Sequence, residues 1–233
     1  MNVKKLLRRL KTSYEKSLRL YKKGIDPWPE GEAGLKVRDH RQMVGGKWEE
    51  LGSLQFNFLK DRGLKPNDTL CDVACGSFRA GRLFIEYLEP GNYLGIDKQA
   101  ELIREGREKE VGESLWIDKR PEIVLSDRFE FSKFSKQPNY AIANSLFTHL
   151  SSNDVKLCLS SLKEIAAPNC KFYATYFQTD VKVFHVHSSH SSRRFEYTKS
   201  QMLKFGRSTG WRADYIGNWN HPAKQVLVCY TNQ

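Results

Sequence analysis

From Thr69 onward, short apolar segments alternate with amphipathic helical segments, and this alternation constrains the fold more than any other feature. Seven segments have the length and composition of buried strands, at residues 69–74, 93–96, 123–125, 140–144, 171–177, 215–219 and 225–230. Helical patterns at residues 79–88, 100–110 and 153–166 separate the first five of them. Strands that alternate with helices predict an α/β fold, in which helices cover both faces of a parallel sheet.

The last two strand segments are connected differently. Only Asn220-His221-Pro222-Ala223-Lys224 joins them, and this length fits a hairpin, whereas parallel neighbours need a crossover of roughly a dozen residues or more. We therefore predict a seven-stranded, mostly parallel sheet with a C-terminal antiparallel hairpin. A helix is expected over residues 199–209, and residues 111–139 have no regular pattern.

The N-terminal region has a different character. Residues 3–23 and 48–62 have helical apolar spacing, and a Pro- and Gly-containing linker separates them. The chain has a formal net charge of +11, of which residues 1–41 supply +7, with 12 Lys and Arg against 5 Asp and Glu. We predict a basic helical extension with its linker over residues 1–40 and the main domain over residues 41–233. A basic arm favours nucleic acid, an anionic surface or simply a solvated helix face.

The cysteines and the hydropathy pattern indicate the cellular compartment in which the protein resides. The five cysteines are widely spaced and contain no C-x-x-C pair, which predicts free thiols in a reducing environment. No apolar run approaches the ~18 residues of a membrane-spanning helix. The basic start is not followed by an apolar signal core, so we expect a cytoplasmic protein without a secretory signal.

The sharpest motif runs from a predicted strand into a predicted helix. It reads Leu70-Cys71-Asp72-Val73-Ala74-Cys75-Gly76-Ser77-Phe78-Arg79. Small residues let the backbone approach a ligand, and a helix N-terminus favours a negative group. The next strand ends in Asp97, and an acid at this place suits a ribose diol. Together these features predict a site for a nucleoside-containing cofactor.

Three kinds of cofactor site can be compared with this motif. A P-loop needs G-x-x-x-x-G-K-[ST], but Arg82-Leu83 follow Gly81, so the lysine and the Mg²⁺-binding hydroxyl are missing. A dinucleotide site needs G-x-G-x-x-G, and Arg79 replaces its third glycine. S-adenosylmethionine (SAM) has no phosphate and needs an acid for its amino group and backbone for its carboxylate. Asp72 and the turn after it supply these, so the motif favours SAM.

Residues 72–77 resemble the D-x-G-x-G-x motif of class I SAM-dependent methyltransferases. Residues 44–52, 93–97 and 145–150 are similar to further motifs of a bacterial subgroup with small-molecule or saccharide-type acceptors, and the resemblance covers residues 40–177, with a weaker match over 195–230. It implies a Rossmann-like fold, SAM as the methyl donor and S-adenosylhomocysteine (SAH) as the product. Ala74 replaces the first glycine of the motif, and we expect it to permit SAM binding if its φ is negative.

The resemblance also implies a set of cofactor-binding residues. The methionine part would lie at the loop, the ribose at the end of the second strand, the adenine after the third, and the sulfonium after the fourth. In chain order the residues are Asp72, Ala74, Cys75, Gly76, Ser77, Arg79, Asp97, Lys98, Asp127, Arg128, Phe129, Asn144 and Ser145. Asp127 would accept a hydrogen bond from the adenine amino group; alternatively, it caps a helix or a turn.

His149 is the candidate catalytic residue. Transfer from a sulfonium is an in-line displacement in which alignment supplies much of the rate. A hydroxyl acceptor also needs a base, whereas an amine needs only to be unprotonated. His149 follows the fourth predicted strand, and its unperturbed pKa of ~6.5 suits a general base. The alternative is that it packs against the cofactor or caps the next helix.

Candidate acceptor contacts lie in and around a polar insertion after the fifth strand. They are Tyr176, His185, His187 and Arg193. Together with His190, the two histidines could hold a metal ion. However, no Cys, Asp or Glu stands nearby, so an acceptor-binding insertion without metal is favoured.

The sequence therefore predicts a SAM-dependent methyltransferase that O-methylates a small-molecule or saccharide acceptor. An RNA methyltransferase that uses the basic arm is one alternative, although the N/D-P-P-Y/F signature of base methylation is missing. A noncatalytic SAM-fold partner protein is another. The oligomeric state is not predicted.

Overall fold

The computed structural model describes residues 29–182 and 188–233. The chain divides into two compact units, Met1–Asp39 and His40–Gln233. The described part of the first unit contains a short helix, α2 (Gly31–Leu35), after which the Arg38 guanidinium donates to the Pro29 carbonyl at 3.1 Å. The helix predicted over residues 3–23 lies outside the described residues. Among the helices that are described, none has the length and apolar character needed to cross a bilayer.

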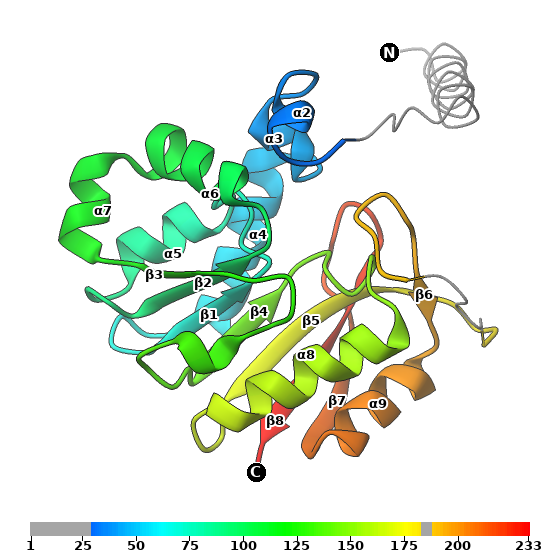
Figure 1. Cartoon of the computed structure of the whole chain (residues 1–233). Helices are drawn as coiled ribbons and strands as arrows, with labels where there is room; N and C mark the ends of the chain where they lie inside the picture. Colours follow the sequence, from blue (N-terminus) through cyan, green and yellow to red (C-terminus); the bar gives the residue numbers. More distant parts are fainter. Residues whose placement is uncertain (1–28, 183–187) are drawn as a thin grey trace. The chain divides into compact units, whose positions relative to one another are not determined.

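The second unit is built on a mixed sheet with the strand order β3-β2-β1-β4-β5-β8-β7 (Figure 1). The strands are β1 (Leu70–Val73), β2 (Tyr93–Asp97), β3 (Glu122–Leu125), β4 (Tyr140–Ala143), β5 (Lys171–Gln178), β7 (Trp211–Asn218) and β8 (Val226–Asn232). Strands β1 to β5 are parallel to their neighbours in this set, and β8 is antiparallel to both β5 and β7. The predicted seven strands and the C-terminal hairpin are therefore confirmed.

Two details of the sheet differ from the prediction. An eighth strand, β6 (Glu196–Tyr197), pairs in parallel with the last two residues of β5, and its two residues are too few to give an alternating pattern. Strand β7 begins at Trp211 rather than at residue 215. It lies at the edge of the sheet, and exposed charged side chains alternate with buried ones in its first residues. These residues therefore do not form the apolar run that is typical of a covered strand.

The helices agree with the predicted ranges except between β2 and β4. The helices α4 (Trp48–Asp61), α5 (Gly81–Tyr87), α8 (Ser152–Ile165) and α9 (Lys199–Ser208) lie where they were expected, and a short helix, α3 (His40–Met43), precedes α4. The helix expected over residues 100–110 is α6 (Ala100–Gly106) followed by a π-helical turn, η1 (Arg107–Val111). The irregular segment contains α7 (Glu113–Lys119) and a 3₁₀ turn, η2 (Phe131–Lys133). No residue of α7 is fully buried, so its apolar pattern is weak.

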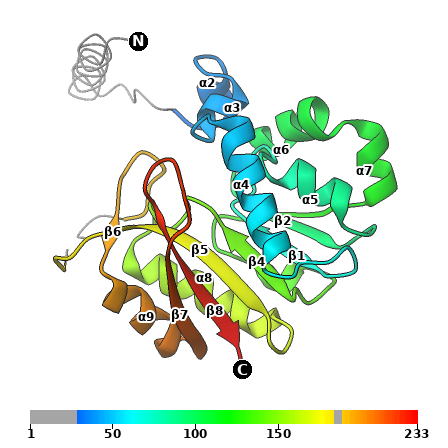
Figure 2. The same ribbon diagram turned by 180° about the vertical axis from the view of Figure 1, so that it is seen from behind.

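The sheet separates two apolar layers. Alternate strand side chains, such as Cys71 and Leu94, pack with residues of α8, whereas Leu70 and Tyr93 pack with residues of α4 and α5. Figures 1 and 2 show α8 and α9 on one face of the sheet and α4 and α5 on the other. Period-two alternation along a strand sends successive side chains to opposite faces, which explains the near-continuous apolar strands. All five cysteines are buried free thiols in these layers.

Candidate functional site

The strand order reverses between β1 and β4, because β2 lies on one side of β1 and β5 on the far side of β4. In open α/β sheets such a reversal leaves a crevice outside the carboxyl ends of the strands, where ligands bind. The segments that follow β1, β2, β3 and β4 all begin at this edge. The fold therefore brings the predicted site segments to one place.

The loop after β1 is tied to the end of β2 through its backbone. The amides of Ala74 and Cys75 both donate to the Ile96 carbonyl, at 2.8 and 3.1 Å, and the Gly76 amide donates to Asp97 Oδ2 at 2.8 Å. This turn places Ala74 in the left-handed region, with φ 61°, and Gly76 at φ 55°. The condition of a negative φ at Ala74 is therefore not met, since the amides of Ala74 and Cys75 both reach the Ile96 carbonyl.

Replacing Ala74 with glycine is expected to stabilise the protein. The left-handed region costs an L-residue about 1–2 kcal/mol. Glycine gives back about 0.5–1 kcal/mol of this through its greater freedom in the unfolded chain. The net gain in the free energy of unfolding is then up to about 1 kcal/mol. Equilibrium urea unfolding measures it.

Ala80 provides the matched control for that substitution, since it lies in the same segment with an ordinary φ of -93°. Ala80→Gly should lower the free energy of unfolding by about 1–2 kcal/mol, because it raises backbone freedom in the unfolded chain and also removes a buried methyl group. If both glycine variants were destabilised alike, Ala74 would not be strained.

Asp97 is the carboxylate that organises the edge. It is 8 % exposed, and its two oxygens accept from the Gly76 amide and, at 2.9 Å, from the Gln99 amide. Burial raises the pKa of Asp97, and these amide hydrogen bonds oppose the rise. Each carboxylate oxygen can accept more than one hydrogen bond, so the group keeps the capacity to accept from a diol. The neighbouring Lys98 is exposed.

Asp72 lies beneath the loop. Its Oδ2 accepts from the Tyr93 hydroxyl at 2.8 Å, and burial raises its pKa to about 6, against the lowering effects of that hydroxyl and of Arg79. Gly81 is needed here, because a Cβ at that position would lie 2.5 Å from the Tyr93 hydroxyl oxygen. Asp72 therefore holds the Tyr93 hydroxyl within the α4–α5 layer, in which the side chain of Cys75 is also buried.

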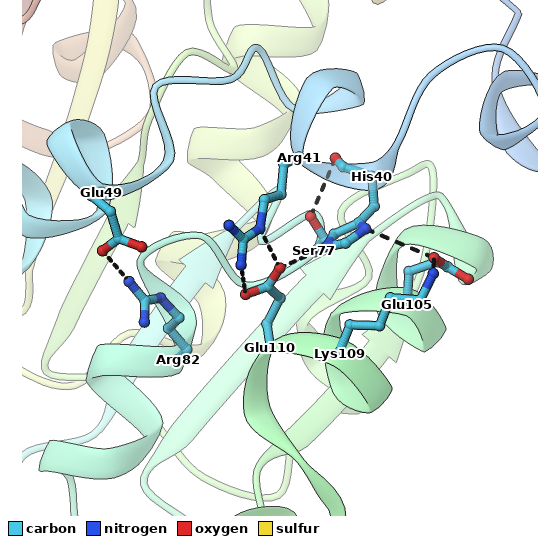
Figure 3. A network of polar contacts seen from close by, with 8 residues as sticks. All are labelled: His40, Arg41, Glu49, Ser77, Arg82, Glu105, Lys109 and Glu110. Carbon is cyan, nitrogen blue, oxygen red and sulfur yellow. Dashed lines mark hydrogen bonds and ion pairs between the residues drawn. The ribbon is translucent and has the colours of Figure 1, made fainter.

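The side chains of Ser77 and Arg79 contact the segment that leads into α4. Ser77 Oγ donates to the His40 carbonyl at 3.5 Å, and Arg79 Nη1 donates to the carbonyls of Val44 and Gly46 at 2.8 and 3.0 Å. Figure 3 shows how this segment is held, with His40 and Arg41 both bonded to Glu110 of η1. Desolvation lowers the pKa of Arg79 to about 10, so the guanidinium remains charged.

The segment predicted to hold adenine follows β3. The Ser126 amide donates to the Asp97 carbonyl at 2.9 Å, which joins this segment to the end of β2. Asp127 and Arg128 are exposed, and Phe129 is half-buried with its ring 6.2 Å from that of Phe131. Ser126 Oγ accepts from the amides of Arg128 and Glu130. Ser126 thus caps this turn, which leaves the side chain of Asp127 for another role.

Two neighbouring polar residues end β4. Ser145, at φ 61°, donates its amide to Thr175 Oγ1 at 2.7 Å, and its hydroxyl bonds to the Gln225 side chain. The Asn144 amide group is different, because both Oδ1 and Nδ2 are buried without a hydrogen-bond partner in the described part of the chain. A buried amide left unpaired is costly and points to a missing polar group. Sequence patterns could not reveal Thr175 or Gln225, since distant segments supply them.

His149 is oriented by the backbone. Its Nδ1 lies 2.6 Å from the Arg193 carbonyl oxygen. A carbonyl can only accept, so Nδ1 carries the proton and Nε2 of the neutral ring has a free lone pair. Burial lowers the pKa of His149, and the positive charge of Lys98 contributes, although the bond to Arg193 opposes the shift.

The predicted acceptor contacts lie in different surroundings. Tyr176 is fully buried in the α8–α9 layer, and its hydroxyl donates to Gln178 Oε1 at 3.4 Å, so its contact with an acceptor stays a prediction. Its position in β5 points into the core, a direction that the insertion after it does not reveal. The Arg193 guanidinium donates to the Ser188 carbonyl at 3.0 Å, and its own carbonyl holds His149. His185 and His187 lie outside the described residues.

No group of three or more His, Cys, Asp and Glu side chains in residues 29–182 and 188–233 could hold a metal ion. His190 is exposed, and its Nδ1 lies 2.8 Å from Ser192 Oγ.

No family model matches the sequence. The structure is similar to that of magnesium protoporphyrin IX methyltransferase from Synechocystis with bound SAM, at TM-score 0.58 and 13 % identity, over 79 % of either chain. It also resembles a glycopeptide N-methyltransferase complexed with SAH (TM-score 0.61, 13 % identity, 78 % of this chain and 90 % of that one). An amino pentose methyltransferase from Micromonospora echinaspora with bound SAM gives TM-score 0.59 at 10 % identity, over 82 % of this chain and 93 % of that one. The chain thus has the fold of the class I SAM-dependent methyltransferases.

Proposed function

We propose that the protein is a SAM-dependent methyltransferase that O-methylates a small-molecule or saccharide acceptor. The observation that carries the proposal is the reversal of the strand order between β1 and β4, together with the bond that ties the loop 74–77 to Asp97 at the end of β2. His149 lies in the segment that follows β4 at the same edge of the sheet. The structural neighbours support the substrate class, since their names specify a porphyrin, a glycopeptide and an amino pentose.

The residues at the edge fit SAM. Asp97 would bind the ribose hydroxyls and Phe129 would cover the adenine, with Asp127 and Arg128 beside it. The unpaired amide of Asn144 would find its missing polar partner at the reacting end of the site. When bound, SAM supplies a methyl group on a sulfonium, which is already activated for displacement.

The protein must then align the acceptor and remove its proton. His149 Nε2 would accept the proton of an acceptor hydroxyl as the new carbon–oxygen bond forms, while the Arg193 carbonyl stabilises the proton already on Nδ1. The lowered pKa keeps the ring neutral and able to accept a proton at neutral pH. This requirement for a base is why a hydroxyl acceptor is favoured over an amine.

The experiment is a transfer assay with methyl-labelled SAM. The acceptor panel holds saccharides, other hydroxylated small molecules, amine analogues of each, and RNA, and both SAH and labelled product are measured. We expect SAH release with a hydroxylated acceptor and little with its amine analogue. Transfer only to RNA would favour the alternative that uses the basic arm. Binding of SAH without turnover on any acceptor would favour the noncatalytic partner protein.

A further inference from the structure

The loop between β7 and β8 contains a buried histidine that the proposed reaction does not use. His221 is 5 % exposed, and its Nδ1 accepts from the Ala223 amide at 3.1 Å. The proton of the neutral ring therefore lies on Nε2, because Nδ1 acts as the acceptor. Nε2 is buried and has no hydrogen-bond partner in the described part of the chain. His221 thus presents an unsatisfied donor.

The sheet register places this loop at the ligand-binding edge. Val226 of β8 pairs with Tyr176 near the carboxyl end of β5 and with Asn218 at the end of β7. Residues 219–225 therefore extend beyond the carboxyl end of β5. Gln225 bonds to Ser145 after β4, which fixes the loop beside the carboxyl end of β4. His221 consequently lies on the β4–β5–β8 half of the edge, whereas Asp97 lies on the β1–β2–β3 half.

Helix α4 contacts both the β7–β8 loop and Arg79, which is a buried cation. Its Phe58 ring packs on Trp219, which in turn lies 5.5 Å from the His221 ring. Its Gly52 packs on Arg79, since a Cβ there would lie 2.7 Å from the Arg79 carbonyl oxygen.

The Arg79 side chain has spare donor capacity. It is 9 % exposed, and its Nε has no hydrogen-bond partner among the described residues. It lies in the loop after β1, and the neighbouring strand β4 is followed by Ser145, to which the loop of His221 is bonded through Gln225. After burial, the charges of Arg79 and Lys47 also lower the pKa of His221. Glu50 is the carboxylate that also acts on His221, and it is paired with Lys47 at 3.0 Å.

The unsatisfied groups at this edge are mostly donors. They are the N–H groups of the His221 imidazole, the Trp219 indole and the Arg79 guanidinium and the Asn144 amide N–H₂, against the Asn144 carbonyl oxygen as the acceptor. Buried donors need acceptors, and a guanidinium prefers an anionic oxygen. The loop amides of Ala74, Cys75 and Gly76 are already bonded to the end of β2 and do not compete for such a group.

We propose that His221 and Arg79 form a subsite for an oxyanion of the acceptor, either a carboxylate or a phosphate. This inference rests on the proposed function, because it names the acceptor class of that same site. His221 would donate from Nε2 to the oxyanion and Arg79 would balance its charge. The acceptor would then carry both a hydroxyl for methylation and an anionic group.

The test is a titration of acetate and of inorganic phosphate into the full-length protein saturated with SAH, followed by the ring ¹⁵N and ¹H signals of His221. We expect a saturable shift of the His221 Nε2–H signal, while the exposed His190 does not shift. In His221→Phe, followed through the Trp219 indole, the anion should bind about tenfold more weakly or worse, because one charge-assisted hydrogen bond is lost. His221→Gln keeps an N–H donor and should restore most of the binding.

Three results would overturn the assignment. The His221 signal could stay fixed at every anion concentration, which would mean that Nε2 is satisfied by a buried water. The shift could occur in the free protein but vanish with SAH bound, which would assign the subsite to the cofactor carboxylate. His221→Phe could bind the anion as the wild type does. If SAH itself fails to bind, the proposed function fails separately, and the titration of the free protein still tests whether His221 and Arg79 bind an oxyanion.

Discussion

His149→Gln is expected to lower turnover by about 10²–10⁴-fold, the range that a positioned general base supplies. The glutamine amide can still donate to the Arg193 carbonyl, so the segment around it should remain in place. It cannot accept a proton at neutral pH, so only the chemical step should suffer. SAH binding should stay within about twofold of the wild type, since His149 holds no cofactor group in this account.

His190→Gln is the matched control for that variant. His190 is exposed and lies in the segment that contains Arg193, and its backbone amide donates to the His149 carbonyl, a bond that the substitution retains. Its turnover should match the wild type. If His149→Gln also kept wild-type turnover, His149 would only pack against the cofactor, and an amine acceptor would become the better hypothesis.

The same base predicts a pH profile. Burial lowers the pKa of His149 from 6.5, so kcat/KM should rise with pH through a single ionisation below 6.5 and stay level above it. The sign follows from the chemistry, because the protonated ring cannot accept a proton. His149→Gln should lose this inflection. An inflection at alkaline pH instead would indicate deprotonation of an acceptor amine.

Asp97→Ala is expected to weaken SAH binding by about 100-fold or more, since each ribose hydrogen bond to a carboxylate is worth about 1.5–3 kcal/mol. The loss has a second source in the protein itself. The amides of Gly76 and Gln99 lose their acceptor, so the loop after β1 is no longer held to the end of β2 in the same way. The melting temperature should fall as well, because two N–H groups at a buried site are left unpaired.

Substitutions of two other acidic residues provide comparisons for the Asp97→Ala variant. Asp214→Ala removes an exposed carboxylate of β7 that pairs with Arg212, and it should leave SAH affinity unchanged. Asp127→Ala should weaken binding by about tenfold, the value of one hydrogen bond to the adenine amino group. If the Asp97→Ala protein melted normally and bound SAH as tightly as the wild type, Asp97 would not bind the ribose.

Much of the fold could be predicted because the strands of a covered parallel sheet are apolar along their whole length. The interior strands β1, β2, β4 and β5 are largely of this kind, so their positions in the sequence could be predicted. The short strand β6 and the start of β7 could not, since two residues have no period and an edge strand mixes exposed charges with buried side chains. Helix α7 was not predicted for a related reason, because none of its residues is fully buried.

The candidate site could be predicted only in outline. Residues next to strand ends, such as Asp97 and His149, are visible in sequence because topology gathers strand ends at one edge. The conformation of Ala74 could not be predicted, because its positive φ belongs to a turn in which two amides share the Ile96 carbonyl. The orientation of His149 could not be predicted either, because it depends on a backbone carbonyl 44 positions away. His221 carried no local signal, since it is buried beside Trp219, which packs on Phe58 of the distant helix α4.

The most direct test of the central claim is a calorimetric titration of SAH into the intact wild-type protein. We expect saturable one-site binding with a dissociation constant on the order of micromolar, or about 8 kcal/mol. Asp214→Ala should give the same isotherm. If the folded wild type gave no binding heat at any temperature and did not protect against thermal unfolding at millimolar SAH, the crevice between β1 and β4 would not be a SAM site.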